Sequence, residues 1–195
     1  MNSSSTIVTA PLAAHHRSRI AEILRSTENF REEEVDVALE LFDESFAGED
    51  YEFLGAFHRE SGTGNRELMD PEVFPIPDSP FPIPELLGFA CFGRSMDTDR
   101  TFDLYWIAVD RAAQGTGCGT VLLSEVERRL EALHARMLVV ETSSRSDYTA
   151  TRGFYVRRGY VEAARVREFY APEDDRIILT KRLAGSPREG WGAVA

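Results

Sequence analysis

A glycine-rich segment near the middle of the chain has the composition of an anion-binding loop. It reads Gln114-Gly115-Thr116-Gly117-Cys118-Gly119 and separates an apolar run from an amphipathic stretch. Backbone N–H groups at the start of a helix point outward at the positive end of the helix dipole, where they bind phosphate. The residues from Thr120 to Ser124 include no acid that would compete for these groups. The segment therefore predicts a phosphate-binding site.

Two well-known phosphate-binding loops, the dinucleotide-binding loop and the P-loop, are also rich in glycine. In a dinucleotide-binding loop, Gly115-x-Gly117 would begin the G-x-G-x-x-G pattern and Glu141 would bind the ribose hydroxyls. Thr120 stands in place of the third glycine, and the chain after Glu141 is too short for the further β-α units of a doubly wound sheet. The Gly-Lys-Ser or Gly-Lys-Thr of a P-loop occurs nowhere in the sequence.

The elements expected around the loop position it between a strand and a helix. Every residue from Leu104 to Val109 is apolar or aromatic, which predicts a strand buried on both faces. A helix follows to about His134, with its apolar stripe on Leu122, Val126, Leu130 and Leu133. The next expected elements are a strand over 137–140 that ends at Glu141, a short helix over 149–158 before a glycine C-cap at Gly159, and strands over 160–169 and 176–181 around a turn.

The N-terminal half predicts strands and helices that alternate less regularly. The expected elements are strands over 5–9, 51–57 and 86–92 and helices over 14–25 and 32–46. Together with the C-terminal half, this order predicts an α/β fold around one mixed sheet. We expect a single domain over residues 1–183, with a proline-rich insertion loop over 59–84 and a flexible tail over 184–195.

Composition and charge argue against several classes of partner and site. The net charge of −11 argues against a nucleic-acid or anionic-membrane partner. Residues 111–158, which include the glycine segment, nevertheless carry 8 arginines and only 5 acids, a locally favourable field for a polyanion. No apolar run approaches a bilayer span and no signal peptide is evident, so we expect a cytoplasmic protein. Cys91 and Cys118 predict neither a disulfide framework nor a metal site.

The glycine segment and its surroundings resemble those of the GCN5-related N-acetyltransferases (GNAT). The acetyl-CoA pyrophosphate loop of that family is written Q/R-x-x-G-x-G/A, and Gln114, Gly117 and Gly119 match it. The strand before the loop and the later Phe154-Tyr155-x-x-x-Gly159-Tyr160 segment strengthen the match, which covers roughly residues 5–183 in element order. The resemblance implies a mixed, mostly antiparallel sheet of about seven strands with helices on both faces, acetyl-CoA as co-substrate, and no metal.

The resemblance also assigns roles to residues on the cofactor side. The backbone of the strand before the loop would pair with the pantetheine arm, and the loop would hold the pyrophosphate. The residues so implied are Ile107, Ala108, Val109, Gln114, Gly115, Thr116, Gly117, Cys118, Gly119 and Thr120. Many family members have an asparagine seven residues before the catalytic tyrosine, whereas this chain has Tyr148 there.

The chemistry of acetyl transfer needs a base for the amine and an acid for the departing thiolate. By resemblance, Tyr155 is the acid; the alternative is a half-buried helix tyrosine. Glu141 is the expected base, as in the enzymes that acetylate the N-terminal alanine of a ribosomal protein; the alternative is a strand-end carboxylate that pairs with Arg145. Tyr105 and Tyr170 are expected to contact the acceptor.

The sequence leaves the acceptor and the level of activity open. The main hypothesis is transfer of an acetyl group to a primary amine of a small molecule or peptide, by a monomer or homodimer. The alternative is a CoA-binding module or sensor without transferase activity, against which the presence of Tyr155 argues.

Overall fold

The computed structural model describes residues 6–48, 50–59 and 85–184. The insertion predicted over 59–84 and the tail predicted over 184–195 therefore lie almost entirely outside the described residues. The described residues form seven strands and four α-helices, as expected for an α/β protein. They divide into two compact units, of which one comprises residues up to Gly93 with Leu104–Val126 and the other Arg94–Asp103 with the residues from Glu127 onward.

The first unit is built on four strands in the order β1-β2-β3-β4. Their bounds are Thr6–Pro11 for β1, Tyr51–Arg59 for β2, Leu86–Arg94 for β3 and Thr101–Val109 for β4. β2 pairs antiparallel with both β1 and β3, with Leu54 opposite Pro11 on one side and Ala90 on the other. These strands are longer than the sequence predicted because pairing continues past their apolar centres.

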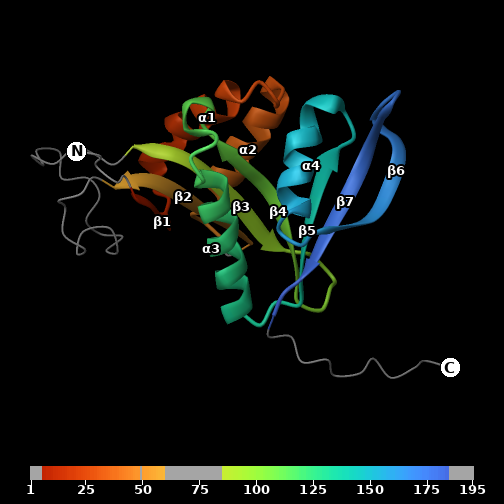
Figure 1. Ribbon diagram of the computed structural model, residues 1–195. Coiled ribbons are helices and arrows are strands. Elements are labelled where there is room, and N and C mark those ends of the chain that lie inside the picture. Colours follow the sequence, from red (N-terminus) through yellow and green to blue (C-terminus); the bar gives the residue numbers. More distant parts are fainter. Residues whose placement is uncertain (1–5, 49, 60–84, 185–195) are drawn as a thin grey trace, which may run out of the picture. The chain divides into compact units, whose positions relative to one another are not determined.

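Two helices pack on one face of these strands and close the core of the first unit. α1 (Arg17–Ser26) and α2 (Glu32–Glu44) lie side by side, as Figure 1 shows. Ile20, Ile23 and Leu24 of α1 are fully buried, and so are Val35 and Phe42 of α2. They join Phe53 and Phe89 of the strands in one apolar cluster. Phe46, the last residue of the predicted helix, is 52% exposed because α2 ends before it.

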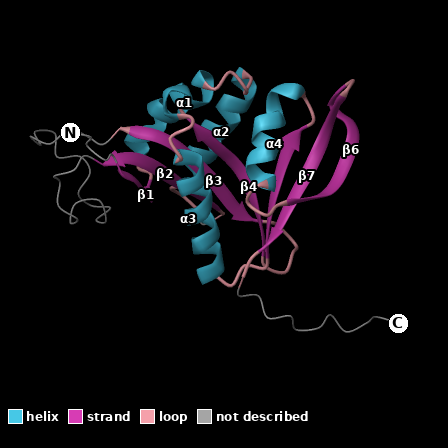
Figure 2. Ribbon diagram, viewed as in Figure 1, coloured by secondary structure: helices cyan, strands magenta, loops and turns pink. Residues whose placement is uncertain are grey.

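The second unit holds three strands in the order β5-β7-β6 and the helix α4. β5 spans Met137–Ser143, α4 Thr149–Val156, β6 Val161–Ala171 and β7 Asp174–Arg182. β7 is antiparallel to both neighbours and lies between them, as Figure 2 shows. α4 ends at Val156, two residues before the predicted end. The glycine C-cap is confirmed: Gly159 takes a φ of +86°, and the N–H of Tyr160 donates to the carbonyl of Tyr155 (3.2 Å).

β6 departs from regular pairing near its C-terminal end. Val166 is opposite Arg176 and Ala171 is opposite Asp174, so the four residues 167–170 bulge out over a single residue of β7. Every residue of β6 is exposed, including Phe169 and Tyr170. The turn that follows is tighter than predicted, because only Pro172 and Glu173 separate the two strands.

Two sequence predictions about buried elements are wrong. β4 is not buried on both faces: Leu104 and Ala108 are buried, but Tyr105 is 40% exposed and Ile107 and Val109 are partly exposed. The long helix α3 (Cys118–Ala132) buries Leu122, Val126 and Leu130 but ends before Leu133, which is exposed. In both cases apolar residues are exposed, because a pattern of apolar residues does not show which other elements cover them.

Candidate active site

The glycine loop begins where β4 ends. Asp110 caps a single 3-10 turn, η2 (Arg111–Ala113), by accepting a bond from the N–H of Ala112 (2.8 Å), and the guanidinium of Arg19 fixes its carboxylate (2.8 Å). The side-chain amide of Gln114 donates back to the carbonyl of Val109 (3.4 Å). These contacts hold the loop against the end of the strand that precedes it.

The two glycines of the loop have conformations that other residues seldom adopt. Gly115 has a φ of +79° and Gly117 a φ of +93°. A Cβ built at either position meets no atom within 4 Å, so the space above the loop is open. Both positions therefore favour glycine because of their positive φ, and not because neighbouring atoms would clash with a side chain. The open space leaves room for a ligand.

The start of α3 presents backbone donors that the protein does not use. The N–H groups of Thr120 and Val121 donate to the carbonyl of Gly117, at 2.9 and 3.0 Å. Within residues 6–48, 50–59 and 85–184, no acceptor binds the N–H groups of Gly117, Cys118 or Gly119. The first turn of α3 contains no acid. Unpaired N–H groups at a helix N-terminus fit the pyrophosphate of acetyl-CoA.

Thr116 and Cys118 shape the loop by different means. The hydroxyl of Thr116 donates to the carbonyl of Ala113 (2.7 Å), which tightens the turn. The side chain of Cys118 is 1% exposed, and burial raises the pKa of its thiol to about 11. A thiol of that pKa is protonated at neutral pH, so Cys118 is not poised as a nucleophile.

β3 and β4 approach closely at the position where β4 leads into the loop. A Cβ at Gly88 would lie 2.7 Å from the carbonyl oxygen of Ala108 and 3.1 Å from the Cα of Val109. Only glycine fits there, and the N–H of Asp110 donates to the carbonyl of Leu87 (2.8 Å). The backbone of residues 107–109, predicted to contact the pantetheine arm, is thus fixed by its neighbour strand.

Tyr155 lies in the second unit, on α4, and is more buried than predicted. Only 3% of it is exposed, and its ring packs against those of Phe154 (5.2 Å) and Tyr160 (5.3 Å). Burial raises the pKa of the Tyr155 hydroxyl above its usual range. The hydroxyl therefore carries its proton at neutral pH, as a general acid must.

Tyr160, next to Tyr155, is held by a polar network. Its hydroxyl donates to Glu127 (3.0 Å), whose other oxygen accepts from Lys181 (2.7 Å). Burial, with the nearby Glu127, raises the pKa of Tyr160 as well. The network fixes the ring that packs on Tyr155 and so restricts the movement of Tyr155.

Glu141 is partly exposed and has a partner that sequence reasoning missed. It lies within β5 opposite Ile178, because the strand continues two residues beyond the predicted end. Its carboxylate accepts a bond from Arg176 of β7, whereas Arg145, the alternative partner considered from the sequence, pairs with Asp147. The guanidinium of Arg176 also lies over the ring of Phe169 (4.7 Å), in the bulge of β6. No sequence spacing links positions 141 and 176; only the β5–β7 register does.

The residues expected at the acceptor lie in different units. Tyr105 of β4 belongs to the first, where its ring meets Tyr51 edge-on (5.4 Å). Tyr170 belongs to the second, where it lies half-exposed in the β6 bulge against Phe169 (5.0 Å). The first unit thus brings together the predicted cofactor contacts and Tyr105, and the second brings together Glu141, Tyr155 and Tyr170 in one β5-β7-β6 layer and its helix.

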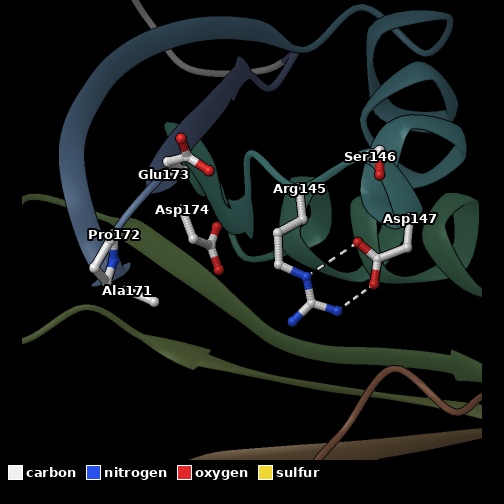
Figure 3. A pocket seen from close by; sticks show the side chains of 7 residues that line it. All are labelled: Arg145, Ser146, Asp147, Ala171, Pro172, Glu173 and Asp174. Atoms are coloured by element: carbon white, nitrogen blue, oxygen red, sulfur yellow. Dashed lines mark hydrogen bonds and ion pairs between the residues drawn. The ribbon is translucent and has the colours of Figure 1, made fainter.

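A cavity of about 550 Å³ opens in the second unit beside the β6–β7 turn. Its walls are residues 145–147 of the β5–α4 connection and residues 171–174 of the turn, as Figure 3 shows. Three carboxylates and the guanidinium of Arg145 line it. The sequence predicted that Tyr170, next to this turn, contacts the acceptor but gave no sign that Arg145 and Asp147 lie opposite the turn.

Comparison with known proteins gives a family for this chain. The model of the acetyltransferase (GNAT) domain matches residues 83–162, which include the glycine loop and Tyr155. A solved structure from Desulfovibrio desulfuricans, assigned to the GNAT acetyltransferases, is 31% identical, with a TM-score of 0.74 over 92% of this chain and 100% of that one. The chain belongs to the GNAT family of acetyltransferases. The predicted fold class, with its mixed seven-stranded sheet, is thereby confirmed.

More distant GNAT structures share the fold alone. The ribosomal-protein-S18-alanine N-acetyltransferase of Escherichia coli is 19% identical, with a TM-score of 0.67 over 95% of this chain and 99% of that one. A Salmonella typhimurium protein assigned as an acetyltransferase, solved with acetyl-CoA, is 18% identical, with a TM-score of 0.62 over 91% and 94%. Among curated proteins, none has a sequence that matches this chain. None of the helices in the described ranges has the length and apolar character needed to cross a membrane.

Proposed function

We propose that this GNAT protein is an N-acetyltransferase that moves the acetyl group of acetyl-CoA to a primary amine of a small molecule or peptide. The observation that carries the proposal is the glycine loop, where unpaired N–H groups at the start of α3 face open space. Within the described residues, the protein supplies no acceptor for these donors. They suit the pyrophosphate of CoA, which the family uses as its acyl carrier. We expect the enzyme to act in the cytoplasm as a monomer or homodimer.

The reaction we propose is direct attack of the amine on the thioester carbonyl. The new C–N bond forms as the C–S bond breaks, and the amine gives up one proton while the thiolate gains one. Cys118 takes no covalent part, because its thiol is buried and protonated. The backbone N–H of Val109 is our candidate for stabilising the carbonyl oxygen as negative charge develops on it.

Tyr155 and Glu141 are the residues we propose for the two proton transfers. Burial keeps the Tyr155 hydroxyl protonated, which supports its role as the acid that protonates the leaving sulfur. Glu141 is partly accessible, and Arg176 binds one of its carboxylate oxygens, Oε1. The other oxygen can accept a proton from the amine, directly or through a water path.

The second candidate function is a CoA-binding module or sensor that transfers nothing. Such a module would bind CoA through the same glycine loop, so a measurement of CoA binding does not distinguish it from an enzyme. The near-complete burial of Tyr155 is the specific observation in its favour, since a tyrosine packed between two rings can serve packing alone.

Release of free thiol from acetyl-CoA, measured over a panel of amines, tests the proposal. The panel should include peptide N-termini, a lysine amide and aliphatic amines, and mass spectrometry should show one added acetyl group on the amine that turns over. Calorimetry with acetyl-CoA on the same preparation establishes that the protein is folded and binds. Binding without acetylation of any amine would favour the inactive module; turnover of one amine class supports the enzyme.

A further inference from the structure

We propose that Arg19 of α1 is a positioning residue for the cofactor. Through the carboxylate of Asp110, it holds the glycine loop in the conformation that receives the pyrophosphate of acetyl-CoA. We expect Arg19 itself to make no contact with the cofactor, because it acts on η2, the turn that links β4 to the loop. The inference rests on the proposed binding of acetyl-CoA at the loop, and it adds α1 to the elements that shape this site.

The guanidinium of Arg19 joins three elements at the end of β4. Its Nη2 donates to Oδ2 of Asp110 (2.8 Å), and its Nε donates to the carbonyl of Leu86 in β3 (3.2 Å). The N–H of Asp110 donates to the carbonyl of Leu87, the next residue of β3 (2.8 Å). The planar fork of an arginine can serve a carbonyl and a carboxylate at the same time. α1, β3 and the residue that follows β4 are therefore held together by one set of polar contacts.

Asp110 is the most shielded of the acidic partners of Arg19. Its side chain is 13% exposed, whereas those of Glu22 (3.2 Å from Arg19) and Glu85 (3.5 Å) are 63% and 69% exposed. Exposed ion pairs contribute little, because water and salt screen them. A shielded carboxylate without a cation is unfavourable. The pair with Asp110 is therefore the contact of Arg19 that the loop depends on.

The position of Asp110 determines how the chain enters the loop. Its Oδ1 accepts from the N–H of Ala112 (2.8 Å), and its carbonyl accepts from the N–H of Ala113 (2.8 Å). The carbonyl of Ala113 in turn accepts from the N–H (3.4 Å) and the hydroxyl (2.7 Å) of Thr116. The next residue, Gly117, is the first of the three loop residues whose N–H groups have no acceptor within the described part of the chain. A movement of Asp110 would therefore be passed through two hydrogen-bonded turns to the groups that bind the pyrophosphate.

A second contact of α1 supports the same segment. The hydroxyl of Ser26 accepts from the N–H of Arg111 (3.2 Å) and donates to the carbonyl of Ile23 (2.8 Å). Ser26 follows Arg19 by seven residues, about two turns of helix, so the two side chains lie on one face of α1. This face is thus attached to two consecutive residues at the base of the loop, Asp110 and Arg111.

Calorimetry with acetyl-CoA on three arginine variants tests the inference. Arg19→Met removes the guanidinium and keeps an unbranched side chain, and it should weaken binding about tenfold. Arg19→Lys keeps the charge but cannot serve both acceptors, so it should weaken binding about threefold. Arg17→Met is the matched control, because it removes the same charge from the same helix, where the partner is Asp43 of α2 (2.9 Å). Its affinity should equal that of the parent.

A fourth variant, Asp110→Asn, distinguishes positioning from simple attraction between charges. It keeps an oxygen for the N–H of Ala112, weakens the contact with Arg19 and removes a negative charge close to the loop. If Arg19 acted only by attracting a polyanion, the loss of this acid should tighten acetyl-CoA binding. If Arg19 positions the loop, the same change should weaken binding. Tighter binding by Asp110→Asn, parental affinity in Arg19→Lys, or an equal loss in Arg17→Met would each overturn the inference.

An amide ¹H–¹⁵N spectrum recorded without acetyl-CoA separates this inference from the proposed function. In Arg19→Met the signals of residues 115–119 should shift or broaden, whereas in Arg17→Met they should keep their parental positions. Dispersed signals elsewhere establish that each variant is folded; if Arg19→Met is not, Arg19→Lys and Asp110→Asn carry the same test. If the loop signals change but the parent neither binds nor turns over acetyl-CoA, Arg19 positions the loop and the transferase proposal fails. If the parent acetylates an amine but Arg19→Met keeps parental loop signals and affinity, the transferase proposal stands and this inference fails.

Discussion

The glycine loop of the first unit and the β5–β7 side of the second unit present different kinds of groups to a ligand. The loop presents backbone N–H groups, fixed by two glycines with positive φ and by the helix that follows. The second unit presents side chains: the buried hydroxyl of Tyr155, the carboxylate of Glu141 and the carboxylates of the cavity. A substitution of a side chain leaves the backbone N–H groups of the loop in place, whereas in the second unit it removes the group that would act on the ligand. The two regions should therefore respond differently to mutation.

The largest expected effect is on the chemical step, in the second unit. Tyr155→Phe keeps the ring and its contacts, so acetyl-CoA affinity and the melting temperature should change little. Loss of general-acid assistance should lower kcat by about 10²- to 10⁴-fold with little change in KM. Steady-state kinetics with an established acceptor amine measure both constants.

Tyr160→Phe is the matched control for this substitution. It removes the hydroxyl of the neighbouring ring and its bond to Glu127, which costs about 1 kcal/mol of stability. Turnover should stay within about threefold of the parent, well below the range for general-acid loss. If both variants behave alike, Tyr155 serves packing and the inactive-module hypothesis regains support.

The next effect concerns cofactor binding in the first unit. Gly117→Glu places a carboxylate over the unpaired N–H groups and forces a non-glycine residue to a φ of +93°. Repulsion of the pyrophosphate should weaken acetyl-CoA binding by about a hundredfold in calorimetry, since like charges in contact cost several kcal/mol. Gly48→Glu adds the same charge where a Cβ meets nothing and φ is unremarkable. Equal affinity in the two variants would place the cofactor elsewhere.

The smallest effect is expected at Glu141. Glu141→Gln preserves the shape of the side chain and a bond to Arg176 but removes the proton acceptor. We expect kcat/KM to fall about thirtyfold, below the usual range for a general base, because a water path can partly replace the carboxylate. The ion pair with Arg176 is partly exposed, so its loss should cost at most about 1 kcal/mol of stability. Glu162→Gln, another ion-paired carboxylate, should leave kcat/KM unchanged.

The contrast between the two regions also explains which of their features the sequence could predict. The glycine loop is a local feature: Gln114, Gly117 and Gly119 lie close together in the chain, and glycine readily adopts the positive φ that Gly117 has. The same holds for the C-cap at Gly159. Contacts such as Glu141 with Arg176 or Ser143 with Asp174 depend on strand register, which no local pattern fixes before the strands pair.

Burial was the least predictable property of the candidate site. The apolar residues of β4 indicated a strand covered on both faces, but Tyr105 is exposed, and Tyr155 is more buried than its position on a short helix suggested. An apolar side chain can be buried, but whether it is buried depends on which elements, distant in sequence, pack against it. The predicted roles of both tyrosines therefore stay predictions that kinetics must test.

The most direct test of the account is an amide ¹H–¹⁵N spectrum of the protein titrated with acetyl-CoA. If the backbone of the glycine loop binds the pyrophosphate, the signals of Gly117, Cys118 and Gly119 should shift most, because their N–H groups gain acceptors that the protein does not supply. Signals of equally exposed glycines such as Gly48 should stay in place. Saturable binding that leaves the three loop signals unmoved would contradict the account.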